Sequence, residues 1–124
     1  MKKPVPYNLV LDYLPERIII RQSFGMYYIY LDKKIVLILR QLRKNLNFNG
    51  LWIATKIEAH ASLKTEVPAI TGFVLDNGKI HDSGWQLLPE SAVDFETAAI
   101  RVCELISKGD QRIGKETGKS FSVE

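Results

Sequence analysis

Short apolar segments separated by polar turns run through most of the chain, and this pattern predicts strands. The clearest pair is Met26–Leu31 and Ile35–Arg40, which are apolar at nearly every position and are separated by the polar residues 32–34. Because successive side chains of a strand point to opposite faces, unbroken apolar runs predict strands that are covered in part on both faces. We therefore expect an antiparallel hairpin, preceded by a tight glycine turn at Phe24-Gly25.

Four further segments predict strands because they are rich in β-branched or aromatic residues and are bounded by turn residues. They are Arg17–Arg21, Leu51–Thr55, Gly72–Leu75 and Gly84–Pro89. The last two flank Asp76–Lys79, where the Asn-Gly pair favours the positive φ angles of a type I′ turn.

Three segments have helical spacing. The first is Asn8–Leu14, capped by Asn8 and ended by Pro15, and the second is Ile57–Glu66. The third opens at Asp94 and ends before Gly109, with one apolar face. That face comprises Phe95, Ala98, Ala99, Val102, Cys103, Leu105 and Ile106. In the second helix we expect Ile57, Ala61 and Leu63 to point inward.

The order of elements is helix, three or four strands, helix, two strands, helix. It predicts an α+β fold with a single antiparallel sheet of about five to six strands and helices packed on it. Residues 1–109 form one domain in this interpretation. Residues 110–124 are polar and charge-mixed, and they predict a flexible C-terminal tail.

Composition and length narrow the class of protein. The 124 residues suit one domain, and the single cysteine excludes an internal disulfide. No apolar run approaches the ~20 residues that span a bilayer, and no signal-peptide pattern follows the first lysines. We expect a cytoplasmic protein that does not bind membranes.

Positive charge is concentrated in one part of the chain. The formal net charge is only +3, but no Asp or Glu occurs between Lys33 and Ile57. The cations there form a candidate basic rim: Lys33, Lys34, Arg40, Arg43, Lys44 and Lys56. Such a rim could bind nucleic acid or an acidic protein partner. The favoured interpretation is a solvated rim that protects a sheet edge from pairing.

Aromatic side chains form a second candidate surface. On a strand, Tyr28 and Tyr30 share one face and Tyr27 lies on the other. Two aromatics beside basic residues resemble the sheets on which single-stranded bases stack. We favour a structural role, in which these tyrosines pack against the strand Ile35–Arg40 and a covering helix.

No motif of a known reaction is present, and we expect neither an enzyme nor a cofactor. Cys103 lies within an apolar helix face, where a thiol is an inert small hydrophobe. His60 and His81, with Glu58 or Asp82, are candidate metal ligands. Their spacing lacks the pattern of a helical ligand pair, so the favoured interpretation is that of ordinary surface histidines.

The motifs Arg21-x-x-Phe24-Gly25, Tyr27-x-Ile29-Tyr30-Leu31-Asp32-x-Lys34 and Trp85-x-Leu87-x-Pro89-Glu90 stand in order along the chain. In this respect it resembles the N-terminal domain of TfoX (Sxy), a bacterial competence regulator, over about Leu9 to Ile106. The sequence departs from that family's pattern at four positions: Ser23, Met26, Tyr28 and Lys33. From the length of the sequence we expect a domain without the helical C-terminal domain of full-length regulators.

This resemblance implies a solitary domain with a fold similar to YjbR-like proteins and no known catalysis. We therefore expect a non-enzymatic regulatory or binding module. The alternative is a self-associating protein–protein interaction domain, such as a homodimer, without nucleic-acid contact. Salt-dependent binding would favour the first, and a dimer in solution would favour the second.

Overall fold

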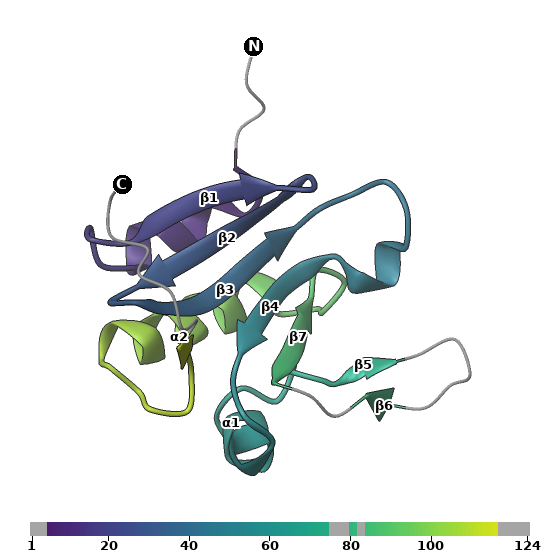
Figure 1. Ribbon diagram of the computed structural model, residues 1–124. Coiled ribbons are helices and arrows are strands. Elements are labelled where there is room, and N and C mark those ends of the chain that lie inside the picture. Colours follow the sequence, from purple (N-terminus) through teal and green to yellow (C-terminus); the bar gives the residue numbers. More distant parts are fainter. Residues whose placement is uncertain (1–4, 75–79, 82–83, 117–124) are drawn as a thin grey trace.

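Antiparallel strands form one main sheet in the computed structural model, which describes residues 5–74, 80–81 and 84–116 (Figure 1). The strands are β1 (Ile19–Ser23), β2 (Met26–Leu31), β3 (Lys34–Arg40), β4 (Gly50–Ala54), β7 (Trp85–Pro89) and β8 (Lys115–Glu116). Their spatial order is β1-β2-β3-β4-β7, and β8 pairs with the first residues of β3. The predicted α+β fold, a single antiparallel sheet of about five to six strands with helices packed on it, is therefore confirmed, and the main sheet has six strands.

Both tight turns of the first hairpins use left-handed backbone. The φ angles are 54° at Phe24 and 77° at Gly25 between β1 and β2, and 52° at Asp32 and 71° at Lys33 between β2 and β3. Two consecutive residues of positive φ match the right-handed twist of the strands they join. Three of these four residues are not glycine, and this conformation costs such residues energy. The pairing of the strands on either side of each turn must offset that cost.

The principal core lies between the sheet and the helices. It joins alternate side chains of the central strands to α2 (Phe95–Ser107), as α2 and the 3-10 helix η1 (Asn8–Tyr13) pack on the same face (Figure 1). The Ser107 hydroxyl donates a 2.7 Å hydrogen bond to the Tyr13 carbonyl, which joins the two helices. Fully buried core residues include Ile29, Leu37, Leu39, Leu51, Ile53, Ala99, Val102 and Cys103.

The three helical segments lie where they were predicted, but some of their details differ. The first segment is a 3-10 helix that follows Tyr7 in left-handed conformation, and no side chain caps it. The second forms η3 (Ile57–Ala59) and α1 (His60–Glu66). Leu63 is buried as expected, but Ile57 is 58% exposed and Ala61 is exposed, so the prediction that both point inward is wrong. The short helix sits at the sheet's end and buries one residue of its turn rather than a full stripe.

The opposite face of the sheet carries a separate cluster, which we call the outer face. Ile35, Ile38 and Ala54 are buried there, and five half-buried residues pack against them: Met26, Tyr28, Tyr30, Trp52 and Trp85. No helix in the described part of the chain contributes to this cluster, so the predicted covering helix over Tyr28 and Tyr30 is wrong. The apolar side chains of α2 and η1 cover only one face of the sheet.

A small second sheet borders the outer face. It consists of β5 (Phe73–Val74) and β6 (Ile80–His81). The Phe73 ring lies 4.9 Å from that of Trp52, edge to face, and 5.9 Å from that of Phe48 in the 3-10 helix η2 (Leu46–Phe48). The turn predicted at Asp76–Lys79 lies outside the described residues.

The segment 110–116 differs from the predicted flexible tail. Ile113 is only 5% exposed and belongs to the main core. Beyond it, Ile35 pairs with Lys115 and Lys34 with Glu116, while the Gly114 amide donates to the Ala54 carbonyl at 2.8 Å. One buried side chain and a strand pairing are enough to fix a segment whose composition is otherwise polar. Residues 117–124 lie outside the described part.

Candidate ligand-binding groove

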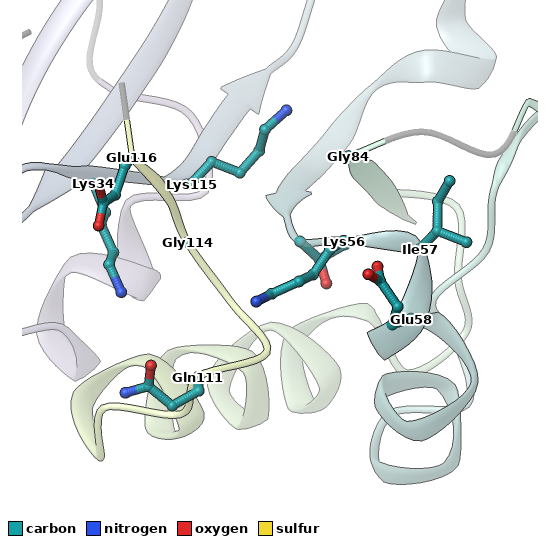
Figure 2. Close-up of a pocket in the computed structure, with 10 residues that line it drawn as sticks. Lys34, Lys56, Ile57, Glu58, Gly84, Gln111, Gly114, Lys115 and Glu116 are labelled. Atoms are coloured by element: carbon teal, nitrogen blue, oxygen red, sulfur yellow. The ribbon is translucent and has the colours of Figure 1, made fainter. Parts of the chain in front are cut away.

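A groove of about 650 Å³ lies where the C-terminal segment passes the end of β4 (Figure 2). We call it the lysine groove. Its walls are the start of β3, the segment that follows β4, and residues 111–116. The lining residues are Lys34, Thr55, Lys56, Ile57, Glu58, Gly84, Gln111, Gly114, Lys115 and Glu116.

Three lysines from three separate segments line this groove, and the Lys115 side chain points toward Gly84, away from that of Lys34 (Figure 2). Lys34 opens β3, Lys56 follows β4, and Lys115 lies in β8 (Figure 2). Two carboxylates, Glu58 and Glu116, also line it, so the side chains leave a net charge of +1. Among the described residues, none of the three ammonium groups forms an ion pair. Their charge therefore remains available to an anion.

Two glycines allow close contacts between the C-terminal segment and the other walls of the groove. Gly114 has a φ of 118°, and a Cβ there would stand 3.2 Å from Cδ of Lys34. A Cβ on Gly84 would meet the Nζ of Lys115 at much less than van der Waals distance. Side chains at these positions would displace the two lysines, so the glycines define the width of the groove.

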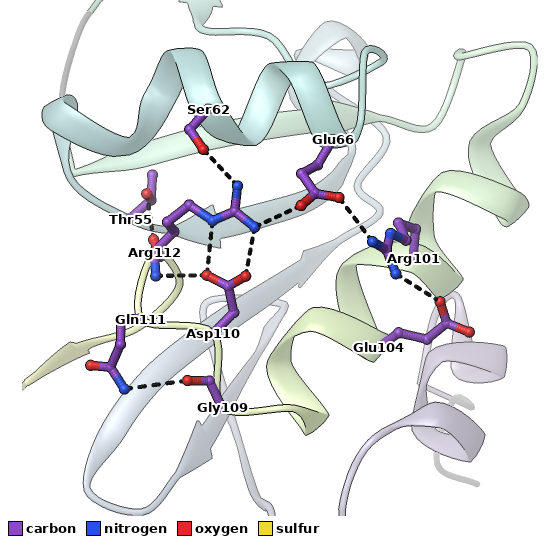
Figure 3. A network of polar contacts seen from close by, with 9 residues as sticks. All are labelled: Thr55, Ser62, Glu66, Arg101, Glu104, Gly109, Asp110, Gln111 and Arg112. Carbon is purple, nitrogen blue, oxygen red and sulfur yellow. Dashed lines mark hydrogen bonds and ion pairs between the residues drawn. The ribbon is translucent and has the colours of Figure 1, made fainter.

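A network of ion pairs fixes the C-terminal segment, which forms one wall of the groove (Figure 3). The Arg112 guanidinium donates to Asp110 at 2.6 Å, to Glu66 at 3.0 Å and to the Ser62 hydroxyl at 2.6 Å. Behind it, the Thr55 hydroxyl donates to the Arg112 carbonyl at 2.6 Å. These contacts tie the C-terminal segment to α1 and to the end of β4.

The pKa values of this network follow from those hydrogen bonds. The bond from Arg112 lowers the pKa of Asp110 below its ordinary value, against the opposing effect of burial. Bonds from Arg101 and Arg112 likewise lower the pKa of Glu66. Both carboxylates are therefore ionised at neutral pH, and the network keeps its charges.

The predicted basic rim is divided between the two ends of β3. Lys34 and Lys56 line the lysine groove, and Lys33 lies in the exposed turn that directly precedes Lys34. Arg43 and Lys44 are exposed in the loop that follows the other end of β3. The strand separates the two groups, so the six cations do not form one continuous surface.

Arg40 of the predicted rim is a structural residue. It is only 6% exposed, and its guanidinium donates to the Asn49 side chain at 2.7 Å and to the carbonyls of Asn45 and Lys44. The Asn49 amide nitrogen in turn donates to the Leu42 carbonyl at 2.9 Å. These bonds organise the loop between β3 and β4 and leave Arg40 unavailable to a ligand.

Tyr7 completes this buried end of the sheet. Its hydroxyl lies 2.7 Å from the Glu90 carboxylate and 2.9 Å from the Arg40 carbonyl, within hydrogen-bond distance of both. Burial raises the pKa of the Tyr7 hydroxyl, and the bond to Glu90 raises it further. Sequence patterns gave no sign of this contact between residues that are far apart in the chain.

Lys115 is the one lysine lining the groove that was not predicted from the sequence. It lies in the segment assigned to a tail, where its charge looked like part of a mixed polar run. The available signal was Ile113, an apolar residue two positions earlier that anchors the segment in the core.

The lysine groove adjoins the outer face through Lys115. Its Nζ lies 5.1 Å from the centroid of the Trp85 ring, a cation–π distance. The strand register extends the connection: Lys115 pairs with Ile35, Ile35 with Tyr30, and Tyr30 with Ile19. One row of side chains therefore runs from the groove across the sheet to β1.

A second row crosses the outer face in parallel. Arg21 pairs with Tyr28, Tyr28 with Ile38, and Ile38 with Trp52. The predicted aromatic surface of Tyr28 and Tyr30 is thus part of a larger one that includes both tryptophans. Burial raises the pKa of the Tyr30 hydroxyl, in accord with its half-buried position.

The candidate catalytic and metal residues do not assemble into a site in the described part of the chain. Cys103 is fully buried, and burial raises the pKa of its thiol to about 12. His60 has a buried Nε2 without a hydrogen-bond partner among the described residues. The His81 side chain and Asp82 lie outside the description, and no three potential ligands among the described residues are placed to hold a metal ion.

Comparison with known proteins yields no relative. No protein-family model, no curated protein and no solved structure matches this chain. In the described residues, every helix is too short or too polar to cross a bilayer.

Proposed function

We propose that this protein is a non-enzymatic binding module that takes up a phosphate-bearing ligand in the lysine groove. The observation that carries the proposal is that Lys34, Lys56 and Lys115 all line one groove, without ion pairs among the described residues. The regulatory role implied by the resemblance to TfoX stays a prediction.

The chemistry of the groove favours phosphate over other anions. Lysine is a compact point charge with three donors, which suits the several oxygens of a phosphate without a fixed orientation. The groove volume of about 650 Å³ leaves space for a small ligand group beside the lysines. The side chains that line the groove keep a net charge of +1, which attracts a doubly charged phosphate more strongly than a singly charged carboxylate.

Titration of inorganic tripolyphosphate, followed by amide NMR shifts, tests the proposal. We expect the largest shifts at Lys34, Lys56 and Gly114. Substitutions Lys34→Gln and Lys56→Gln should each weaken binding about five- to tenfold, on the order of 1 kcal/mol. Lys44→Gln is the matched control, because it removes the same charge at the other end of β3.

The control variant should bind like the unmodified protein. Absence of binding, or equal losses in all three variants, would reject the lysine groove as the site. Equal losses would instead indicate a response to overall charge.

Self-association is a second candidate function, and the position of β1 favours it. β1 is the terminal strand of the sheet order, with Gln22 and Ser23 exposed. A terminal strand offers backbone groups to a second copy of the chain. Light scattering over a range of protein concentrations tests this candidate, since a monomer throughout would exclude it.

A further inference from the structure

We propose that the ligand is single-stranded nucleic acid, with phosphates in the lysine groove and bases stacked on the outer face. This inference rests on the proposed function, because it assigns the phosphate-bearing ligand of the same groove. Its independent support is the aromatic surface that begins where the groove ends.

The contact between Lys115 and Trp85 joins the two parts of the site. The same lysine lines the groove and lies 5.1 Å from the Trp85 ring centroid. A phosphate bound at Lys115 therefore places the attached nucleoside beside an aromatic ring. Alternation of cationic and aromatic groups at this spacing is typical of surfaces that bind single strands.

The dimensions of the outer face suit several bases. The row from Arg21 through Tyr28 and Ile38 to Trp52 covers three inter-strand spacings, or about 14 Å. A four-stranded sheet in RNA-binding domains accommodates two or three stacked bases on its aromatics. The face is therefore wider than a mononucleotide needs, and an oligonucleotide uses its full width.

Positive charge borders the aromatic residues on both sides. Arg21 stands on β1 opposite Tyr28, and Lys115 stands on β8 in the row of Tyr30. A strand that crosses the face from one to the other keeps its phosphates near cations while its bases lie over the rings. This complementarity favours a polyanion with aromatic groups over a second copy of the chain.

Trp52 is held ready for stacking. Its indole nitrogen donates to the Phe48 carbonyl at 2.8 Å, and Phe73 packs edge-on at 4.9 Å. A ring fixed from two sides loses little freedom when a base stacks on it. A duplex keeps its bases inside the helix, so only a single strand can use such a surface.

Binding of a fluorescein-labelled 12-nucleotide oligo(dT) tests the inference. The comparison ligands are an abasic strand with the same number of phosphates and a 12-base-pair duplex. We expect oligo(dT) to bind at least tenfold more tightly than the abasic strand, since each stacked base contributes about that factor. Both tryptophans of the chain lie on the outer face, so oligo(dT) should also quench intrinsic fluorescence and the abasic strand should not.

Tyrosine variants assign the bases to the outer face. Tyr28→Ala should weaken oligo(dT) binding about tenfold and leave tripolyphosphate binding unchanged, whereas Tyr28→Phe should bind normally. Tyr13→Ala is the matched control, because Tyr13 is 43% exposed and belongs to the helix layer on the opposite face. Circular dichroism of Tyr28→Ala verifies the fold, and Tyr28→Leu replaces it if that variant unfolds.

The outcomes separate this inference from the proposed function. Equal affinity for oligo(dT), the abasic strand and the duplex would overturn the inference, while tripolyphosphate binding would still support the groove. Failure of all four ligands would reject both. A dimer that Tyr28→Ala abolishes, without oligo(dT) binding, would assign the outer face to a second copy and overturn the inference.

Discussion

The Nζ atom of Lys115 lies 5.1 Å from the centroid of the Trp85 ring, and this contact joins the lysine groove to the outer face of the sheet. The lysine reaches the ring because residue 84 is glycine, and a Cβ there would collide with the ammonium group. A small residue next to a tryptophan thus controls the position of a binding cation.

Gly84→Ala should therefore weaken ligand binding without unfolding the protein. The colliding atom is the end of a flexible side chain, so Lys115 can move aside and stability should change by less than about 0.5 kcal/mol. We expect tripolyphosphate affinity to fall by the same factor as in Lys115→Gln. The two substitutions should not add in the double variant, because both remove one lysine from the groove. Additive losses in calorimetric titrations would contradict this account.

Arg112→Gln should lower stability in a pH-dependent way. The pKa values of Asp110 and Glu66 are below their ordinary values of 3.8 and 4.5, mainly because of hydrogen bonds from arginines. A carboxylate whose pKa is lowered on folding stabilises the fold at pH values above its ordinary pKa. This stability is lost as pH falls through the pKa of the folded state. We expect a small loss of stability at pH 7, because these pairs are partly exposed and solvent screens them.

Thermal unfolding of the Arg112→Gln variant between about pH 7 and pH 3 checks this prediction. Its difference from the unmodified protein should shrink below about pH 4.5. Arg17→Gln is the control, because Arg17 pairs with Asp32 in an exposed bridge at 2.8 Å and should matter less. A difference that stays constant over this pH range would show that Arg112 acts by packing alone.

Asn49→Ala should be among the most destabilising single changes in the loop after β3. Asn49 is 1% exposed, accepts from Arg40 at 2.7 Å and from the Leu42 amide at 2.9 Å, and donates to the Leu42 carbonyl. Alanine leaves a buried guanidinium and two backbone groups without these partners, at a cost of about 3 kcal/mol. Asn47→Ala, at an exposed position, should change stability by less than about 0.5 kcal/mol. Denaturant unfolding of both variants decides, and equal midpoints would contradict the assignment.

Cys103 should react with thiol reagents only when the protein unfolds. The side chain is fully buried, and burial raises its thiol pKa to about 12, so the thiolate is scarce in the folded state. Labelling by a disulfide reagent at pH 8 should be at least about a thousandfold slower than in denaturant. Rapid labelling of the folded protein would place the thiol at the surface and contradict the structure of the α2 interface.

Local patterns predicted much of the fold. The runs Met26–Leu31 and Ile35–Arg40 became β2 and β3, because an apolar strand between turn residues has few alternatives. The segment after Asp94 became α2, because its apolar stripe matches the helical period. These elements depend on neighbours in sequence, and their register follows from the turns.

The site was less accessible from sequence because its parts come together only through strand pairing. Lys34 and Lys56 are far apart in the chain but line one groove with Lys115, whose segment is fixed by one buried side chain, Ile113. Arg40 carried the same charge signal but is consumed by the loop it organises. Composition cannot distinguish a cation that binds a ligand from one that holds the fold.

The salt dependence of oligo(dT) binding tests the central claim most directly. Three groove lysines that neutralise three phosphates of a single strand contribute about −2 to the slope of log affinity against log salt concentration. Lys56→Gln should reduce this slope by about 0.7, and Lys44→Gln should leave it unchanged. A slope near zero, or one that the two substitutions alter equally, would contradict the assignment of nucleic-acid phosphates to the lysine groove.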